Sequence, residues 1–183
     1  MAGEREARFR SIFELSEREI LAYALRRVRR PEDAADVVAE TFLAAWRRID
    51  DVPDGDAGRL WLYGAARRVL ANQRRGDLRR SRLADALRVE LAATAVAPAP
   101  ADQSSVLRDA LGRLEEPDRE VLALRYWEEL TPAEIAVVLG VPAVTARSRL
   151  HRARRRLRNS LARGSTVGAP VTRPAPMLKR TET

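Results

Sequence analysis

Residues 131–158, TPAEIAVVLGVPAVTARSRLHRARRRLR, decide the fold of the second half of the chain. Thr131 and Glu134 have the spacing of a capping box, with Pro132 at the first helical position. Gly140 is a typical C-terminal stop for the short helix that this cap begins. A turn then leads into a longer, arginine-rich helix. Two helices joined by a short glycine turn predict a helix-turn-helix.

The longer helix has two different faces. Its apolar residues recur at helical spacing and predict the core-facing side, namely Ala146, Leu150, Ala153 and Leu157. The opposite face and its flanks carry the residues that we expect to contact DNA, namely Val144, Thr145, Arg147, Ser148, His151, Arg152 and Arg155. An α-helix fits the major groove, where arginine reads guanine. Arg154 and Arg156 lie nearer the core side, so we expect them to reach phosphates or a partner protein.

Composition also indicates a polyanionic partner. The 183 residues carry a net charge of +8, and 33 of the 34 basic residues are arginine. There is no cysteine, and His151 is the only histidine, so the sequence offers no disulfide, no zinc cluster and no triad. We therefore expect no catalytic residues, no metal and no cofactor. Neither a signal segment nor a membrane-length apolar run is visible, so we expect a soluble, cytoplasmic protein.

The charge is unevenly distributed along the chain. Residues 31–58 contain eight acidic residues and two arginines, whereas residues 67–82 contain seven arginines and one acid. A helix is predicted from about residue 33 to 49, with a core seam of Val38, Phe42, Ala45 and Ile49. Its outward face carries Asp33, Asp36 and Glu40. A protein that only coated DNA would have no use for this face, so it indicates a second, basic partner.

These patterns predict an all-α protein of two small helical domains joined by a flexible linker. The first domain would cover 1–87, with helices at about 6–30 and 33–49, a loop at 50–58, and a third helix from Arg59 that Gly76 ends or bends. An Ala/Pro-rich linker would cover 88–104, and the helix-turn-helix domain 105–163. The Gly-, Pro- and Thr-rich tail, 164–183, is expected to be disordered.

Aromatic residues offer a further interpretation. Trp46, Trp61 and Trp127 could stack on single-stranded bases. Each lies in an apolar helical segment, so we expect all three to pack in the core. Tyr63 and Tyr126 are expected to be structural for the same reason.

Four stretches resemble one known family. They are DAADVVAETF (33–42), RLWLYGAAR (59–67), REVLALRYW (119–127) and the segment from Glu134 to Arg154. In this order and spacing they resemble the sigma-seventy superfamily of RNA polymerase sigma factors, in particular its extracytoplasmic-function (ECF) group. The resemblance covers about residues 9–161, and the linker matches poorly.

The resemblance implies a role for each charged surface. Asp33, Asp36 and Glu40 would dock on the clamp helices of the polymerase β′ subunit, and the second domain would meet the β flap. A second set would read the minus-ten promoter element, namely Arg67, Arg68, Asn72, Arg74 and Arg75. The arginine-rich helix of the second domain would read the minus-thirty-five element. The loop 53–59 would capture an unstacked base during melting, and an anti-sigma factor could cover the docking surfaces.

The chain departs from the family pattern at a few positions. Ala39 stands where glutamine is usual, and Gly64 where arginine is usual. A glycine inside a helix costs about 0.5–1 kcal/mol relative to alanine, and at Gly64 it permits close approach of DNA or another helix. Val144 and Ala146 stand where glycine and valine are usual. These changes bear on promoter preference.

Two other classes of protein compete with this interpretation. A stand-alone helix-turn-helix regulator would bind operators without polymerase, but two arginine-rich helices and an acidic face argue against it. A nuclease would need carboxylates clustered around a metal, whereas the acids here lie on one outward face and in a loop. The sequence therefore favours a non-enzymatic initiation factor that binds core RNA polymerase and directs promoter recognition and melting.

Overall fold

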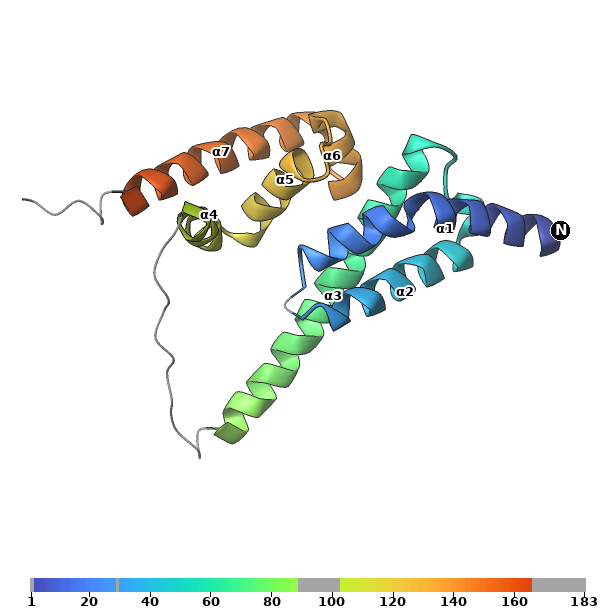
Figure 1. Cartoon of the computed structure of the whole chain (residues 1–183), viewed down its shortest axis with the longest axis horizontal. Coiled ribbons are helices and arrows are strands. Elements are labelled where there is room, and N and C mark those ends of the chain that lie inside the picture. The colour runs from blue at the N-terminus through green and yellow to red at the C-terminus, as the bar shows by residue number, and fades with distance from the viewer. Residues whose placement is uncertain (1, 29, 89–102, 166–183) are drawn as a thin grey trace, which may run out of the picture.

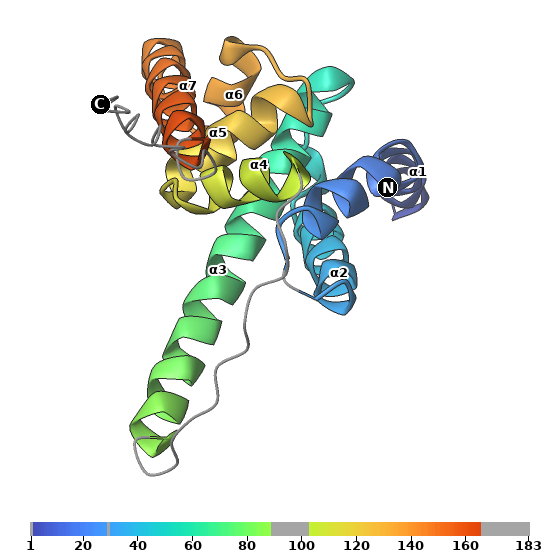
Figure 2. The same cartoon turned by 60° about the vertical axis from the view of Figure 1, so that its left-hand side comes forward.

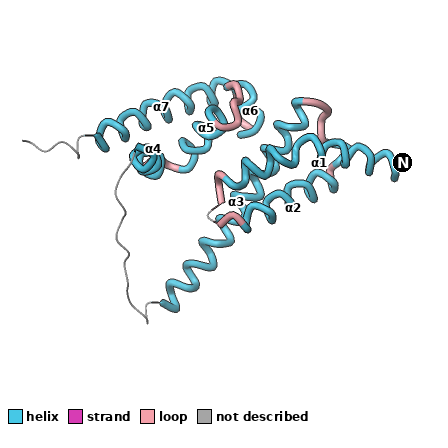
Figure 3. The backbone as a smooth tube through the Cα atoms, in the orientation of Figure 1, coloured by secondary structure: helices cyan, strands magenta, loops and turns pink. Residues whose placement is uncertain are grey.

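The computed structural model describes residues 2–28, 30–88 and 103–165. Throughout these ranges the regular secondary structure is helical (Figure 3). The prediction of an all-α fold is confirmed. The proposed linker and tail fall almost entirely on residues 89–102 and 166–183, which lie outside the described ranges.

The first domain contains three long helices and one short one. These are α1 (Ala2–Leu25), α2 (Glu32–Arg47), the 3-10 helix η1 (Ile49–Asp51) and α3 (Asp56–Arg88). α1 and α2 pack against each other and against the first half of α3, whose second half extends beyond them (Figure 2). Phe13 and Phe42 meet at the α1–α2 contact, with ring centroids 4.7 Å apart. The predicted seam of α2 faces this core, since Phe42, Ala45 and Ile49 are buried.

Several predicted boundaries in this domain are wrong. The first helix ends at Leu25 and not near residue 30, and the second ends at Arg47 and not at 49. The third helix starts at Asp56, inside the expected loop, because the backbone N–H groups of Gly58 and Arg59 already donate to the carbonyl of Gly55. It also runs through Gly76 to Arg88 without a break. A single glycine costs a helix only about 1 kcal/mol relative to alanine, which a helix of 33 residues tolerates.

The second domain contains α4 (Gln103–Gly112), α5 (Glu116–Tyr126), α6 (Pro132–Leu139) and α7 (Ala143–Ser165). The capping box of α6 is present in full, with Thr131 N–H donating to Glu134 Oε2 at 2.6 Å and Glu134 N–H to Thr131 Oγ1 at 3.3 Å. Gly140 has φ +64°, a conformation that glycine adopts without strain. The helix-turn-helix prediction is confirmed for α6 and α7.

The two domains lie against each other (Figure 1). Helix α3 of the first domain packs against α6 of the second. Gly64 lies at this contact, where an added Cβ would stand 3.5 Å from the carbonyl oxygen of Val138. The close approach expected at Gly64 is therefore to another helix. Within the described residues, no helix is long and apolar enough to span a membrane.

Candidate protein and nucleic-acid interfaces

The acidic face of α2, formed by Asp33, Asp36 and Glu40, points away from the core. Asp36 and Glu40 are exposed, and neither makes an ion pair with any other described residue. Asp33 is half-buried, and its Oδ1 lies 2.8 Å from Nη2 of Arg30. The opposite side of the helix is closed by buried apolar residues. We call these three acids the docking face.

Three other acids of the 31–58 block are paired within the chain, whereas Asp56, at the start of α3, is exposed and has no ion pair among the described residues. Asp50, Asp51 and Asp54 pair with Arg5, Arg48 and Arg8 at 3.8, 2.9 and 3.0 Å. These carboxylates are more than half exposed, so each pair adds little stability. Their charge is nevertheless balanced locally. On α2, Asp36 and Glu40 therefore remain without a compensating charge among the described residues.

The predicted minus-ten residues lie along the middle of α3. Arg68, Asn72 and Arg75 are exposed, and the Arg75 guanidinium donates to the amide oxygen of Asn72. Arg67 and Arg74 are half-buried toward the second domain. The Arg74 guanidinium donates to a carboxylate oxygen of Glu116. Helix α3 thus carries both predicted minus-ten residues that are exposed and predicted minus-ten residues that face the second domain.

The predicted minus-thirty-five residues lie on the outer side of α7. Most of them are exposed, namely Val144, Arg147, Ser148, His151, Arg152 and Arg155, and Thr145 is half-buried. Ala146, Leu150 and Ala153 are buried on the opposite side, and Leu157 is half-buried. The predicted division of this helix into a core face and an outer face is confirmed. The outer face thus carries three exposed arginines, Arg147, Arg152 and Arg155, beside smaller side chains.

Two further arginines of α7 have partners inside the domain. Arg154 Nε donates to the Tyr126 hydroxyl at 3.0 Å, and Arg156 Nη1 to Asp118 Oδ2 at 2.5 Å. This hydrogen bond and the charge of Asp118 raise the pKa of Arg156. Both arginines are thereby held beside α5.

The aromatic residues divide between core and surface. Trp61 is partly buried against the core and Tyr63 is 2 % exposed, as predicted. Trp46 and Trp127 are 40 % and 51 % exposed, and Tyr126 is 59 % exposed, so core packing is wrong for these three. Trp46 lies at the edge of the α1–α2 contact, where one face meets Phe9 at 5.3 Å. Trp127 and Tyr126 lie where α5 ends.

The loop expected to capture a base is shorter than the predicted 53–59, since α3 begins at Asp56. Gly58 fixes its shape, because a Cβ there would collide with the carbonyl of Pro53. Only glycine permits the loop to fold back this closely on the first turn of α3.

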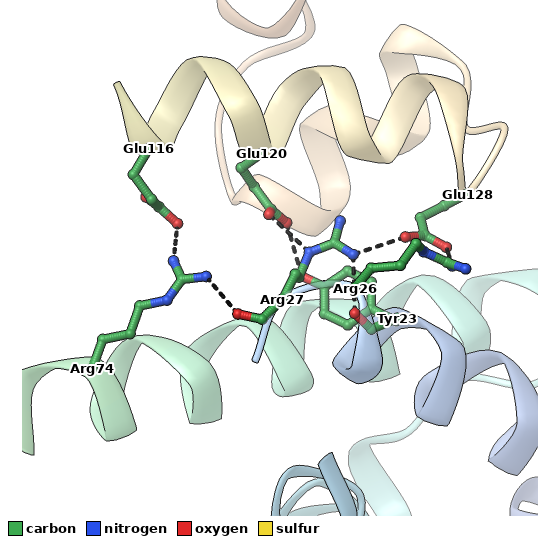
Figure 4. Close-up of polar contacts among 7 residues, drawn as sticks. All are labelled: Tyr23, Arg26, Arg27, Arg74, Glu116, Glu120 and Glu128. Atoms are coloured by element: carbon green, nitrogen blue, oxygen red, sulfur yellow. Dashed lines mark hydrogen bonds and ion pairs between the residues drawn. The ribbon is translucent and has the colours of Figure 1, made fainter. Parts of the chain in front are cut away.

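Sequence reasoning missed a group of polar contacts between the domains (Figure 4). Arg27 Nε donates to Glu120 Oε2 and Arg27 Nη1 to Glu128 Oε1, both at 2.9 Å. The three side chains are 5 %, 9 % and 2 % exposed. The Tyr23 hydroxyl donates to Glu120 Oε1 at 2.8 Å, and Arg26 Nη2 to Glu128 Oε2 at 2.5 Å. The partners are 93 to 102 residues apart in sequence, so no local pattern could have revealed them.

Burial shifts the ionisation of the groups at this contact. Desolvation, followed by the charge of Glu120, raises the pKa of Tyr23 well above its ordinary value. Desolvation alone would lower the pKa of Arg27, but the neighbouring Tyr23, Glu120 and Glu128 outweigh it and raise that pKa. Desolvation and the charge of Glu19 raise the pKa of Tyr63 to about 12. Arg27, Glu120 and Glu128 thus form a buried cluster of paired ionisable side chains.

Taken together, a helix-turn-helix with exposed arginines, a second arginine-bearing helix and an exposed acidic face characterise a two-domain, helical protein of the DNA-binding class. Family models agree with this class. The model for sigma-70 region 2 matches residues 12–80, and the model for sigma-70 region 4 matches residues 104–157.

Individual relatives extend the match over most of the chain. The ECF RNA polymerase sigma factor SigL of Mycobacterium tuberculosis is 30% identical over 166 residues, which cover 87% of this chain and 92% of SigL. The RNA polymerase sigma factor YlaC of Bacillus subtilis is 29% identical over 151 residues, covering 79% of this chain and 87% of YlaC. The chain therefore belongs to the ECF group of the sigma-70 family of RNA polymerase sigma factors.

Solved structures show the same fold. The sigma factor RpoE of Bartonella quintana, in complex with the anti-sigma factor NepR, matches with a TM-score of 0.64 and 25% identity, over 84% of this chain and 96% of that one. CnrH, in complex with the cytosolic domain of CnrY, matches with a TM-score of 0.55 and 26% identity, over 84% and 89% of the two chains.

Family membership establishes the general function. The chain is a sigma factor, which binds core RNA polymerase and promoter DNA and acts in promoter recognition. The alternative of a stand-alone regulator is not favoured. Sigma factors are in general non-enzymatic initiation factors.

Proposed function

We propose that the chain divides promoter recognition among three surfaces. The docking face on α2 binds a basic surface of core polymerase, the clamp helices of β′. The arginines of α3, with Asn72, read the minus-ten element, and the outer face of α7 reads the minus-thirty-five element. The domains would be 1–87 and 105–163, and the chain would work in the cytoplasm without catalysis of its own.

One observation carries the assignment of the docking face. Asp36 and Glu40 are exposed and make no ion pair with the described residues, whereas Asp50, Asp51 and Asp54 all have arginine partners. Carboxylates without an internal partner supply complementarity to a basic surface, which orients docking and speeds encounter. A basic partner protein therefore fits this face better than DNA does.

The assignment of the α7 face rests on exposure and geometry. Six of its seven predicted residues are exposed along one side of a helix whose other side is buried. The lack of bulky side chains at Val144 and Ser148 leaves room for close approach to base edges, and the flanking arginines supply bidentate donors. Promoter melting would then be assisted by polymerase, with an unstacked base held near the Pro53–Gly55 turn.

In vitro transcription on a genomic library tests the proposal. Core polymerase with the wild-type chain should yield a defined set of start sites that share two upstream elements. The double variant Asp33→Arg, Asp36→Arg should yield none, whereas the double variant Glu14→Arg, Glu17→Arg, with the same charge change on an exposed part of α1, should yield the wild-type set. Start sites unchanged by the docking-face variant would overturn the assignment.

A further inference from the structure

The polar contact between the domains joins side chains that are otherwise costly to bury. It involves residues of α1, of the turn that follows it and of α3 on one side, and of α5 and the turn after it on the other (Figure 4). We call these residues the latch, namely Tyr23, Arg26, Arg27, Arg74, Glu116, Glu120 and Glu128. Arg27 is at its centre, because it bonds two glutamates of the second domain and its guanidinium lies 3.6 Å from the centre of the Tyr23 ring.

The arrangement held by the latch cannot read a whole promoter. Elements centred about 10 and 35 base pairs upstream are about 25 base pairs apart, or ~85 Å along B-form DNA at about 3.4 Å per step. Helix α3, which carries the minus-ten residues, packs directly against α6, the partner of the minus-thirty-five helix. The two domains must therefore separate before both elements can be bound at once.

The latch also occupies one of the residues assigned to DNA. Arg74 donates to Glu116 of α5 and, at 3.4 Å, to the backbone carbonyl of Arg27. Arg67 faces the same contact and lines, with Arg74, Glu116 and Glu120, a cavity of about 40 Å³ between the domains. By contrast the docking face and the outer face of α7 remain exposed in this arrangement. Polymerase can therefore reach α2 while the domains are still together.

The chemistry of the latch suits a contact that forms and breaks. Removing two carboxylates and a guanidinium from water costs about as much as their attraction returns, so buried ion pairs often add little net stability. Nη2 of Arg27 is buried without a hydrogen bond, which adds to the cost. Since one chain carries both domains, even a weak contact, with a dissociation constant just below the millimolar effective concentration of a tethered domain, holds them together. Such a contact can hold the free protein and yield to a competing surface.

We infer that the latch keeps the free protein closed by contacts within the chain alone, and that core polymerase, docking on the exposed face of α2, opens it. The closed form is the resting state in solution, without a second protein. The closure itself does not depend on the proposed function, but its release by polymerase does.

The chain is suited to a direct measurement of closure because it contains no cysteine. Cysteines placed at Ser11 on α1 and Asn159 on α7, both exposed, take two spin labels at defined positions. The distance between the labels in the free protein should show one narrow population comprising more than about 90% of molecules, since a minor state in such an equilibrium is commonly 0.1–10%. Core polymerase should replace it with a longer distance.

Two kinds of variant open the latch by different routes. Arg27→Glu places a third carboxylate against Glu120 and Glu128, and should move most free molecules to the long distance. Arg18→Glu, at an exposed position of α1, has the same charge change and should stay closed. Gly64→Leu keeps every charge but pushes a side chain into the carbonyl of Val138, and should also open. Gly64→Ala fits, because its Cβ meets only ordinary contacts, and should stay closed.

Each outcome decides something. The latch is overturned if the distance between the two labels is broad or long in the free wild-type protein. It is also overturned if the Arg27→Glu and Gly64→Leu variants both stay closed. If Arg27→Glu loses helicity by circular dichroism, Gly64→Leu, in which leucine is the better helix former, decides the question alone. A closed free protein that fails to bind core polymerase leaves the latch standing and overturns the proposed docking.

Discussion

Two acids of α2, Asp36 and Glu40, differ from two acids of the second domain, Glu120 and Glu128, in the presence of a partner inside the chain. Asp36 and Glu40 are exposed and make no ion pair with the rest of the described chain, whereas Glu120 and Glu128 are buried against Arg27. A carboxylate in water with no partner is available to another molecule at little desolvation cost. A buried carboxylate in a complete pair is available only if the pair is broken. The same residue types thus serve docking in one region and closure in the other.

Reversing the docking face should have the largest effect. The double variant Asp33→Arg, Asp36→Arg presents positive charge to a basic surface, and like-charge contact costs several kcal/mol. Affinity for core polymerase should fall by more than about 1,000-fold. Fluorescence anisotropy of the labelled chain measures this. The melting temperature should fall only slightly, since neither side chain faces the core and the Arg30–Asp33 pair that is lost lies at the surface.

Truncating the centre of the latch should come next. Arg27→Ala leaves Glu120 buried without an ion pair and Glu128 with Arg26 alone, and breaking a buried pair in this way costs the closed arrangement about 3–5 kcal/mol. The domains should then unfold in two calorimetric transitions, where the wild-type protein shows one. Arg18→Ala is the control and should keep a single transition. An unchanged calorimetric profile for Arg27→Ala would mean that the domains do not stabilise each other.

A comparison within α7 should have a smaller effect. Arg152→Ala and Arg155→Ala each remove an exposed arginine, and each should weaken binding of the holoenzyme to promoter DNA by about 1–3 kcal/mol, with loss of sequence preference. Arg156→Ala instead removes the partner of Asp118 and should lower the stability of the second domain. If all three variants lost sequence preference for promoter DNA equally, exposure would not distinguish the arginines that contact bases from those that stabilise the domain.

The pH dependence of the tyrosines reports on the buried contact. The pKa of Tyr63 is raised from 10.0 to about 12 in the folded protein. Its neutral form therefore stabilises the fold fully below pH 10, and that contribution is lost as the pH rises toward 12. Tyr23 should also ionise late, and Glu120→Gln should lower its pKa by removing a neighbouring charge. Ultraviolet absorbance titration of the wild-type protein and of the Tyr23→Phe variant separates the ionisation of Tyr23 from that of Tyr63. Ionisation of all three tyrosines together near pH 10 would contradict these shifts.

The smallest effect concerns the turn that carries Glu128. Glu129 has φ +57°, a left-handed conformation that costs a residue with a Cβ about 1–2 kcal/mol. Glu129→Gly should relieve part of this and stabilise the second domain by about 1 kcal/mol. Chemical denaturation measures the difference. A destabilised variant would show that the carboxylate of Glu129 has a role that the backbone conformation does not reveal.

Local patterns predicted most of what lies within single elements. The capping box at Thr131 and Glu134, the glycine stop at Gly140 and the two faces of α7 follow from spacing along one helix, and all are present. Helix ends were less predictable, because α3 begins and continues according to hydrogen bonds around Gly55 and the tolerance of Gly76. The exposure of Trp127 and Tyr126 was not predicted. Both residues have apolar neighbours in sequence, but this does not indicate which side of a helix end packs against the rest of the protein.

The latch was beyond local patterns altogether. Arg27 and Glu120 look like ordinary surface residues of amphipathic helices, and only the packing of one domain on the other buries them. Gly64 was the one signal in the sequence, since a glycine in place of a large residue indicated close approach of a second body. Whether that body was DNA or another helix could be decided only from the tertiary structure.

The most direct test compares the affinity of core polymerase for the Gly64→Leu variant with its affinity for the Gly64→Ala variant. It asks whether the acids of the docking face serve binding while the acids of the latch serve closure. If the latch keeps the free chain closed while the docking face stays available, polymerase must open the Ala variant but not the Leu variant. The Leu variant should then bind about tenfold more tightly, since a population shift from a minor open state is no longer needed. Equal affinities, or weaker binding by Gly64→Leu, would contradict the account.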